Sequence, residues 1–539
     1  MYKKLLPFLF LVVSFHFVKA QNEFTTIWKV GPLGDPAVQA PSQAANNQIW
    51  FPGIGQNFTI AWEEVGYPQH NAILTNVTST KQVLIDFGTA LNPVPSEIKY
   101  RVKVSNGNGI FQQIRFGQSI VSPITQDTPL FYNLGSADKL LEVEHWGTIQ
   151  WTSMFCAFVG CNSLKITATD IPNFSGTTDL SYMFYNAPNL IVSPSFYTWN
   201  TSTIKNFQAM FGYSYQQVIN DTFDAPLYWD TSAGENFSYM FYGRQAFNQN
   251  ISNWNMMSAI NLKHMFNGTT AFNQSLNNWN VSNVTNMNHM FYYSAYNQPL
   301  NNWNTSSVTD MSSMFSVSKF NQPINSWNIS NVTTIQSMFH DADFFNQSLA
   351  SWNTANIINA SYAFAGADSF NQNLASWNLN SLTNATHSIG ASGIDCINYS
   401  NTIEGWANNP NTPNNVPFMA LPFVKYSPDV IPQRNILISK GWLIMGDTLG
   451  TCQIIRENLS TSENSLSQIS IYPNPAQDIV YVKNLSDAKN FIITDLSGRI
   501  ITKDTFQNDH INISNLIKGS YILQIIAKDK IHTFKFIKK

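Results

Sequence analysis

Aromatic residues recur at a nearly constant interval through the middle of the chain. From Trp199 to Trp377 the tryptophans stand 24 to 30 residues apart, most of them 24 or 25. A Met-Phe or Ala-Phe pair keeps step with them, and from Phe247 onward a Phe-Asn-Gln or Tyr-Asn-Gln triplet precedes each tryptophan. A repeat of this length cannot bury its own apolar side chains, so we expect successive repeats to stack and share one core. The aromatic residues that we place in this core are Trp254, Phe266, Trp279, Phe291, Trp303, Phe315, Trp327, Phe339 and Trp352.

The spacing inside one repeat predicts two short elements. Val284, Met287 and Phe291 stand three and four residues apart, which is typical of a helical turn. The Gln-x-Leu-x-x-Trp segment at residues 274–279 suits a short strand. The pattern therefore predicts a repeat solenoid in which every coil of 24–25 residues holds a short strand and a helical turn. We interpret the aromatic positions as core rather than ligand-stacking surface, and the repeated asparagines as corner chemistry rather than a sugar-binding surface.

The flanking regions lack the repeat pattern. We expect the solenoid to cover residues 146–390. Residues 21–145 carry short alternating runs between Gly, Pro and Asn turns, which predicts a β-rich N-terminal region. Residues 391–452 lose the aromatic phase and predict a C-terminal cap, and residues 453–467 are a polar linker. Residues 468–539 hold about seven strand-like runs, which predicts a small Ig-like β-sandwich.

The start of the chain predicts export. A pair of lysines precedes an apolar run at residues 5–18, and a small residue follows at position 20. This order is typical of a signal peptide, here residues 1–20, with cleavage between Ala20 and Gln21. No later apolar segment reaches the about 18–20 residues of a transmembrane helix, so we expect no transmembrane segment. Charged residues make up 11% of the chain and the net charge is −3, which argues against a broad nucleic-acid-binding surface.

The four cysteines are compatible with two disulfides in an oxidising compartment. We predict one disulfide between Cys396 and Cys452, within the cap. Cys156 and Cys161 lie five residues apart and either pair or stay buried singly. The absence of a CxxC pair disfavours a zinc ribbon.

Residues that could perform chemistry are sparse in the repeats. Asp341 and Asp343 are the only close pair of carboxylates between positions 246 and 390, and we interpret them as a solvated turn. A glycosidase needs two carboxylates that face each other across the scissile bond. His264 and His289 fall in successive repeats, but no Cys or carboxylate accompanies them in sequence, so we expect no metal site. We therefore predict a protein without catalytic, cofactor-binding or metal-binding residues; the alternative is a carbohydrate-active enzyme, or its accessory module, on the repeat scaffold.

The beginning of the repeats resembles a known family. Residues 157–164 read Ala-Phe-Val-Gly-Cys-Asn-Ser-Leu, which is similar to the AF-x-G-C-x-x-L core of the treponeme-type leucine-rich repeat. Later repeats keep the frame and replace Ala-Phe by Met-Phe. Residues 140–452 thus resemble the BspA-like family of bacterial surface proteins. The resemblance implies a solenoid of leucine-rich-repeat type and an extracellular role in binding or adhesion to proteins or cells.

The C-terminal region resembles the sorting domain of the type IX (Por) secretion system. The likeness rests on a Tyr-Pro-Asn-Pro segment, an Asp-x-x-Gly-Arg turn, a Leu-x-x-Gly-x-Tyr run and a lysine-rich end, in this order. The residues that carry it are Tyr472, Pro473, Asn474, Pro475, Gly498, Arg499, Gly519 and Tyr521. It implies contact with the type IX secretion machinery, passage across the outer membrane of a Gram-negative bacterium and attachment to the cell surface. The expected protein is secreted and binds proteins, cells or polysaccharide, with the ligand unknown.

Overall fold

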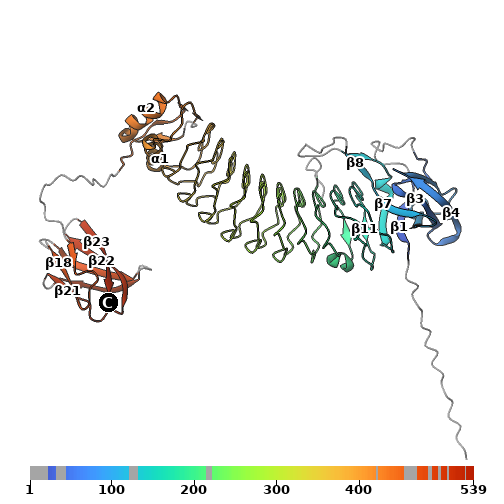
Figure 1. The fold of residues 1–539 in the computed structure, drawn as a ribbon, viewed down its shortest axis with the longest axis horizontal. Helices are drawn as coiled ribbons and strands as arrows, with labels where there is room; N and C mark the ends of the chain where they lie inside the picture. Colours follow the sequence, from blue (N-terminus) through green and yellow to red (C-terminus); the bar gives the residue numbers. More distant parts are fainter. Residues whose placement is uncertain are drawn as a thin grey trace, which may run out of the picture. The chain divides into compact units, whose positions relative to one another are not determined.

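The computed structural model describes most of the chain, in two compact units, Met1–Ile454 and Ile455–Lys539, which we treat separately (Figure 1). The described residues are 22–31, 44–119, 131–213, 221–419, 423–454, 470–483, 488–495, 499–506, 509–527 and 530–539. The predicted signal peptide and its cleavage site between Ala20 and Gln21 lie outside these residues.

The N-terminal part of the first unit is built on one mixed sheet of eight strands, in the order β12-β11-β10-β1-β6-β3-β4 with β7 paired to β3. Alternation explains strand β6, since Tyr100, Val102 and Val104 are buried while the residues between them are partly exposed. The larger strands are β1 (Phe24–Lys29), β3 (Gly53–Glu64), β4 (Tyr67–Ser79), β6 (Lys99–Ser105), β7 (Ile110–Ile114) and β10 (Leu140–His145). Smaller elements are the pairs β2 (Gln48–Phe51) with β5 (Val83–Asp86) and β8 (Gly117–Ser119) with β9 (Phe131–Asn133), and the 3-10 helices η1 (Pro95–Glu97) and η2 (Ala137–Lys139).

This sheet leads directly into the repeats. Strand β10 pairs in parallel with β11 (Lys165–Ile166), which pairs in parallel with β12 (Ile191–Val192). The 3-10 helix η3 (Pro194–Thr198) follows, and all these elements share one hydrophobic core cluster. The N-terminal sheet therefore covers the first coil and supplies the strand on which the next coils are laid.

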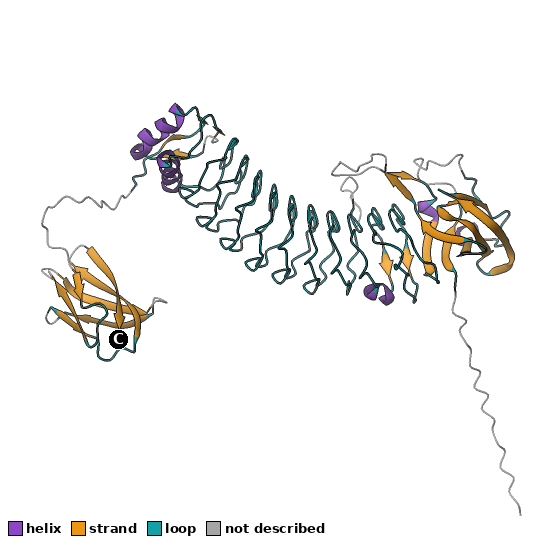
Figure 2. Ribbon diagram, in the orientation of Figure 1, coloured by secondary structure: helices purple, strands orange, loops and turns teal. Residues whose placement is uncertain are grey.

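The coils beyond this point are built from turns. Between positions 199 and 395, the described residues contain neither a helix nor a strand (Figure 2). Neighbouring coils are joined by isolated parallel bridges at one phase of the repeat. These bridges link, in succession, Asn206, Asn236, Asn261, Asn286, Asp310, Thr334, Asn359 and Asn384.

The predicted fold class, a leucine-rich-repeat-type solenoid with a strand and a helical turn in each coil, is wrong. The expected strand at 274–279 is irregular chain and turn, and the expected helical turn around Met287 is a succession of tight turns. His289 has a φ of 55°, and its N–H donates to the Ser312 carbonyl of the next coil at 2.8 Å. A left-handed residue ends an α-helical hydrogen-bond ladder, because it turns the adjoining peptide away from the helix axis. The apolar spacing thus reflects packing across coils instead of one face of a helix.

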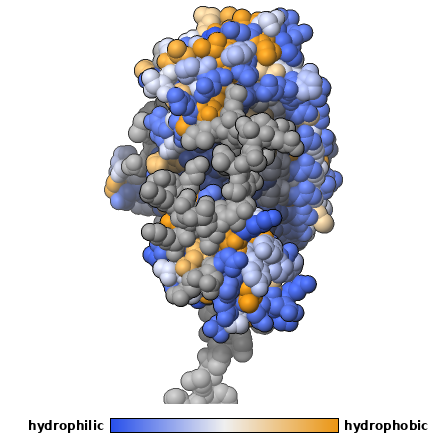
Figure 3. All heavy atoms as spheres, turned by 90° about the vertical axis from the view of Figure 1, so that its left-hand side faces the viewer, coloured by the Kyte–Doolittle hydropathy of each residue, from blue (hydrophilic) through white to orange (hydrophobic). Residues whose placement is uncertain are grey.

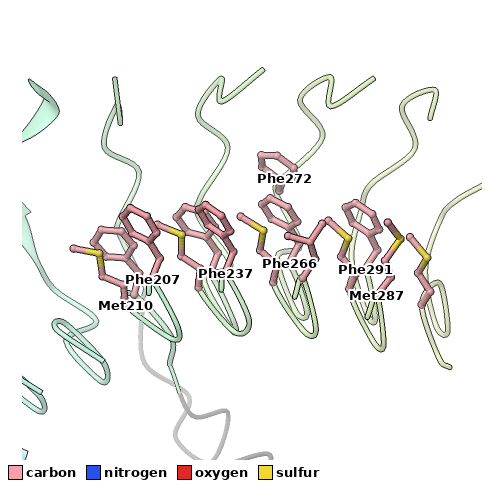
Figure 4. Packing of buried hydrophobic residues seen from close by; sticks show 14 of the residues in the cluster. Phe207, Met210, Phe237, Phe266, Phe272, Met287 and Phe291 are labelled. Atoms are coloured by element: carbon pink, nitrogen blue, oxygen red, sulfur yellow. The ribbon is translucent and has the colours of Figure 1, made fainter. Parts of the chain in front are cut away.

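Columns of stacked aromatic rings form the core of the repeats (Figure 4). The Phe291 ring lies parallel to those of Phe266 and Phe315 in the adjacent coils, with centroids 5.6 Å away in each case. From Trp229 to Trp377 each repeated tryptophan also anchors its coil to the previous one, as where Trp303 Nε1 donates to the Leu276 carbonyl at 2.8 Å. The aromatic residues that the sequence places in the core, all buried here, are Trp254, Phe266, Trp279, Phe291, Trp303, Phe315, Trp327, Phe339 and Trp352.

The Phe-Asn-Gln triplet forms a second column of contacts. The Oδ1 atom of Asn297 accepts the backbone N–H of Asn321 at 2.9 Å and the Gln322 side-chain amide at 3.2 Å. Asn273 holds Asn297 in the same way at 2.9 Å. These asparagines satisfy backbone donors that no strand partner reaches, so they belong to the framework of the stack.

The cap at the end of the first unit contains both of the α-helices found among the described residues of that unit. Helix α1 (Cys396–Asn408) begins at Asp395, whose side chain accepts the Asn398 N–H. The predicted disulfide between Cys396 and Cys452 is confirmed, with a Cα–Cα distance of 6.1 Å. The other elements are η4 (Pro428–Val430), α2 (Ile431–Ser439) and the parallel pairs β13 (Pro417–Met419) with β15 (Leu443–Met445) and β14 (Lys425–Tyr426) with β16 (Thr448–Leu449). Apolar side chains are exposed at this end, among them Leu443 and Met445. Figure 3 shows orange, hydrophobic surface at the top of the view.

The second unit has two antiparallel sheets around one small core. The sheets have the strand orders β17-β18-β21 and β20-β19-β22-β23. Val480 of the first sheet and Leu523 and Phe536 of the second are fully buried in the shared core. The strands are β17 (Ser470–Tyr472), β18 (Ile479–Lys483), β19 (Ala488–Asp495), β20 (Ile500–Thr505), β21 (His510–Asn512), β22 (Gly519–Ala527) and β23 (Lys530–Lys538).

Candidate binding face of the repeats

The most regular polar surface of the protein follows the parallel bridges between coils. In the coil of Asn286 it consists of residues 285, 286, 288 and 289, and it continues through the equivalent residues of the neighbouring coils. We call this surface the ladder face. The bridge residues themselves form turns, as where the Asn286 Oδ1 accepts the Asn288 N–H at 2.9 Å. Their side chains are thereby fixed, and those at the other positions contact solvent or the next coil.

One position of the ladder face is held in the left-handed region in every coil. It is the residue before the Met-Phe or Ala-Phe pair, and its φ lies between 54° and 60° from Tyr239 to His387. Positive φ is uncommon for residues other than glycine. Here it aims alternate N–H groups at the next coil, as where the His264 N–H donates to the Asn288 carbonyl at 2.9 Å. The residues of this column are Tyr239, His264, His289, Ser313, Ser337, Tyr362 and His387.

The left-handed column carries neighbouring rings at both of its ends, stacked at one end and tilted at the other. The ring of His264 lies 4.4 Å from those of Tyr239 and His289, nearly parallel to each. Farther along, the rings of Tyr362 and His387 lie 5.2 Å apart. The two groups of rings are separated by two coils in which the column holds serine.

A polar hollow of about 500 Å³ lies on the ladder face at the coils with small residues. Ser313 contributes to its wall, whereas the equivalent residue of the preceding coil is His289, which carries a ring. The residues that line it are Asn288, His289, Asp310, Ser312, Ser313, Thr333, Thr334, Gln336, Ile358 and Asn359.

Hydrogen bonds between coils hold the side chains of the hollow in place. The Asn288 Oδ1 accepts from His289 Nδ1 at 2.6 Å, which requires the proton on that ring nitrogen, and the Asn288 Nδ2 donates to Asp310 at 3.2 Å. The hydroxyls of Ser312 and Thr334 are 2.9 Å apart. A third pair crosses from Asn359 Nδ2 to Gln336 Oε1 at 3.0 Å. The lining is thus a connected polar network contributed by four coils.

The residues that line the hollow carry little formal charge. Asp310 is the one carboxylate among the described residues that line it, and no Lys or Arg lines it. One oxygen of Asp310 caps the Ser312 N–H at 2.8 Å and the other accepts from Asn288. The carboxylate therefore acts in the turn and the network, and the hollow has no second carboxylate to face it.

The other residues considered for chemistry are not brought together. Asp341 contacts His340 at 3.2 Å and is half exposed, as expected for a solvated turn, and Asp343 does not line the hollow. Among the described residues, no group of three His, Cys, Asp or Glu side chains is placed to hold a metal ion. Cys156 and Cys161 are both free and buried, and burial raises the pKa of each thiol well above its usual value.

Two buried carboxylates have structural partners. Glu64 accepts the Leu91 and Asn92 N–H groups at 2.8 Å and contacts His70 Nδ1 at 2.5 Å. Burial raises the pKa of Glu64, but these hydrogen bonds together outweigh it and leave the pKa below the usual 4.5. Glu64 therefore ties the chain after β5 to the N-terminal sheet. The second carboxylate, Asp221, pairs with the buried Arg244 at 2.8 Å.

The first half of the predicted sorting motif is anchored to the last strand of the second unit. Tyr472 is the last residue of β17, and Pro473 and Pro475 flank Asn474. The Asn474 Oδ1 accepts the Ile537 N–H of β23 at 3.0 Å. The segment thus closes one edge of the C-terminal unit.

The second half of the motif lies at strand ends. Gly519 begins β22, and the Tyr521 hydroxyl donates to the carbonyl four residues before it at 2.8 Å. Arg499 forms an exposed ion pair with Asp495 at 3.0 Å. Gly498 lies outside the described residues.

Sequence reasoning missed the left-handed column and the hollow. The signal was present in the residue before each Met-Phe or Ala-Phe pair, which changes from rings to serine and back to rings along the repeats. This change could be interpreted only with the direction of that side chain known, and the helical turn that we predicted would have given the side chain another direction.

Comparison with family models agrees with this division of the chain. Residues 152–226, 215–318 and 293–395 match a family described as Mycoplasma protein of unknown function, DUF285. Residues 470–539 match the secretion system C-terminal sorting domain. Neither match is to a leucine-rich-repeat family, so the BspA-like resemblance stays a prediction.

No curated protein matches the chain. Within the described residues, no helix has the length and apolar character needed to cross a membrane. The chain therefore combines repeats of the DUF285 type with a type IX sorting domain, which indicates a secreted protein of the outer cell surface.

Proposed function

We propose that the protein is a surface adhesin that binds an extracellular protein or polysaccharide through the ladder face and performs no catalysis. The observation that carries the proposal is the hollow, a preorganised polar network of four coils in a surface that otherwise repeats with little change. Ligand sites typically combine concave shape with a few well-placed polar groups.

The distribution of side chains between the core and the surface of each coil supports this role. Rings such as Phe291 and Trp303 are buried in the stack, and Asn297 is committed to backbone donors. The ladder face is left with hydroxyls, amides and occasional rings at a spacing of about 4.8 Å between coils. Such a surface suits many weak contacts made together, in which avidity compensates for modest affinity at each coil.

An enzymatic role finds less support in the same site. Acid–base hydrolysis of a glycoside calls for two carboxylates across the bond to be broken. Asp310 stands alone in the hollow and is held by Ser312 and Asn288.

A binding experiment with the purified full chain tests the proposal. The chain is applied to arrays of matrix proteins and of polysaccharides at low and high salt, and the same polysaccharides are assayed for cleavage products. We expect binding that changes little with salt, because few charges lie on the repeats, and no cleavage. Cleavage of a polysaccharide that the Asp310→Asn variant no longer performs would refute the proposal.

The surface location has its own test. We propose that the mature protein starts at Gln21 and ends between about residues 452 and 468, after removal of the sorting domain. Mass spectrometry of protein released from the cell surface should find these ends. Recovery of Lys539 in the surface-attached form would contradict removal of the sorting domain.

A further inference from the structure

We propose that the hollow on the ladder face is a subsite for a short stretch of an uncharged polysaccharide. The inference rests on the proposed function, since it assigns a ligand class to one place on the surface that the function requires. It concerns the hollow alone, and the remainder of the ladder face provides supporting contacts.

The dimensions of the hollow suit an oligosaccharide. Its volume of about 500 Å³ falls within the range of about 300–1,000 Å³ that is typical of ligand sites. Its walls come from four successive coils, from His289 to Asn359, and three steps between coils cover roughly 14 Å. A flexible chain of linked rings can therefore lie along the direction in which the coils follow one another.

The functional groups of the hollow both donate and accept hydrogen bonds. Hydroxyls of Ser312 and Thr334 and amides of Asn288, Gln336 and Asn359 can each do both. Sugar hydroxyls have the same dual character, so each can pair with the lining without leaving a buried group unsatisfied. Because the side chains are already held by one another, little conformational entropy is lost when a ligand binds.

Charge and apolar content favour a neutral sugar over two other classes of ligand. An acidic polysaccharide would meet Asp310 with no Lys or Arg in the lining to compensate for it. A protein ligand is usually held by Trp, Tyr or Arg side chains at the centre of an interface, and the lining contains none of these three. Ile358, 46% exposed, and the ring of His289 contribute apolar surface on which the C–H face of a sugar ring can rest.

The shape of the hollow depends on Ser313. Tyr239 and Tyr362 occupy the same position in other coils, with φ values of 60° and 58°, against 54° for Ser313. The backbone of this column therefore accepts tyrosine, and Ser313→Tyr should fill the hollow without unfolding the coil. Ser330→Tyr provides the matched control, because Ser330 lies at the corner after Trp327 and does not line the hollow.

The test compares the full chain with the two variants Ser313→Tyr and Ser330→Tyr, using soluble oligomers of glucose, mannose, xylose and N-acetylglucosamine, and oligogalacturonate as the acidic probe. Calorimetry should show that at least one neutral oligomer binds the wild type and Ser330→Tyr equally. Ser313→Tyr should weaken this binding by about tenfold or more, since the added ring occupies the volume of the ligand.

The possible outcomes separate this inference from the proposed function. Neutral-oligomer binding that Ser313→Tyr leaves unchanged would overturn the subsite while the function stands. Binding of the acidic probe alone, or of proteins alone on the arrays, would overturn the ligand class. Failure of the full chain to bind any protein or polysaccharide would overturn the proposed function itself. A thermal unfolding scan of Ser313→Tyr that superimposes on that of Ser330→Tyr shows that any loss of binding is local.

Discussion

Arg244 is fully buried among the coils, and its replacement should be one of the most damaging single changes in the repeats. Its Nη1 donates to Asp221 at 2.8 Å, its Nη2 donates to the Ala187 carbonyl at 3.0 Å, and its Nε donates to the Phe211 carbonyl. The guanidinium also lies over the Phe223 ring. One side chain thus connects segments of several coils.

The cost of Arg244→Met follows from what it leaves behind. The side chain of Asp221, 2% exposed, would keep its charge with only two backbone N–H groups at 3.3 Å and no cation beside it, and two carbonyls would lose their donors. Removal of one member of a buried ion pair costs about 3–5 kcal/mol. Burial lowers the pKa of Arg244, with Asp221 opposing that effect, so the charged guanidinium depends on the carboxylate. The double variant Arg244→Met with Asp221→Asn should therefore recover more than about 1.5 kcal/mol relative to the sum of the single variants.

Urea unfolding of the full chain, followed by hydrogen exchange of peptides from residues 221–247, measures this effect where it occurs. Exchange is needed because stacked repeats unfold in parts and one global transition can hide a local one. Lys205→Met is the matched control, since Lys205 pairs with Glu235 at 2.8 Å but both side chains are about half exposed, and loss of an exposed pair costs about 1 kcal/mol or less. The reasoning is refuted if Arg244→Met costs no more than this control, or if the costs of Arg244→Met and Asp221→Asn simply add.

Three further changes have expected outcomes. Phe291→Ala should lower the free energy of unfolding of the repeats by about 3–5 kcal/mol, because the ring is fully buried between two others. Phe344→Ala, at an exposed site, should cost little, and equal effects of the two variants in urea titrations would contradict the stacked core. Cys396→Ser should destabilise the cap by about 4 kcal/mol, since the disulfide joins two residues separated by 56 positions in the sequence. A thermal unfolding scan of the wild type that is the same with and without reductant would contradict a stabilising role of this disulfide. The pKa of Glu64 lies below 4.5 in the folded state, so its stabilising contribution is complete above that pH and is lost as the pH falls through the lower value. Glu64→Gln should therefore weaken the acid dependence of N-terminal unfolding below about pH 4.5, and an unaltered acid midpoint would show that Glu64 carries none of it.

The sequence predicted the contents of the core and the disulfide better than the local backbone. The period of Trp279 and Trp303 requires that equivalent rings meet, whatever the conformation between them, so stacking could be inferred from spacing alone. Cys396 and Cys452 flank the one segment between the repeats and the linker, which made their pairing the natural choice. These inferences use distances along the chain and do not depend on φ and ψ.

The prediction of a helical turn around Met287 was wrong because the spacing of apolar residues does not distinguish one face of a helix from a set of turns hydrogen-bonded to the next coil. In both cases every third or fourth side chain points inward. The deciding feature is the positive φ of His289, and neither His nor Ser signals that conformation as glycine would. The hollow could not be predicted for the same reason, because its position follows from the direction in which Ser313 and His289 point.

The hydrogen bonds that join one coil to the next have a mechanical consequence. The N–H of His264 and its equivalents are directed along the succession of coils, so tension between the two ends of the stack acts on these bonds one coil after another. Each coil that peels away, such as the 24 residues from Trp279 to Trp303, releases about 80 Å of extended chain. Under load the stack would therefore lengthen in a series of small unfolding steps. Each released coil could restack on its neighbour when the load falls.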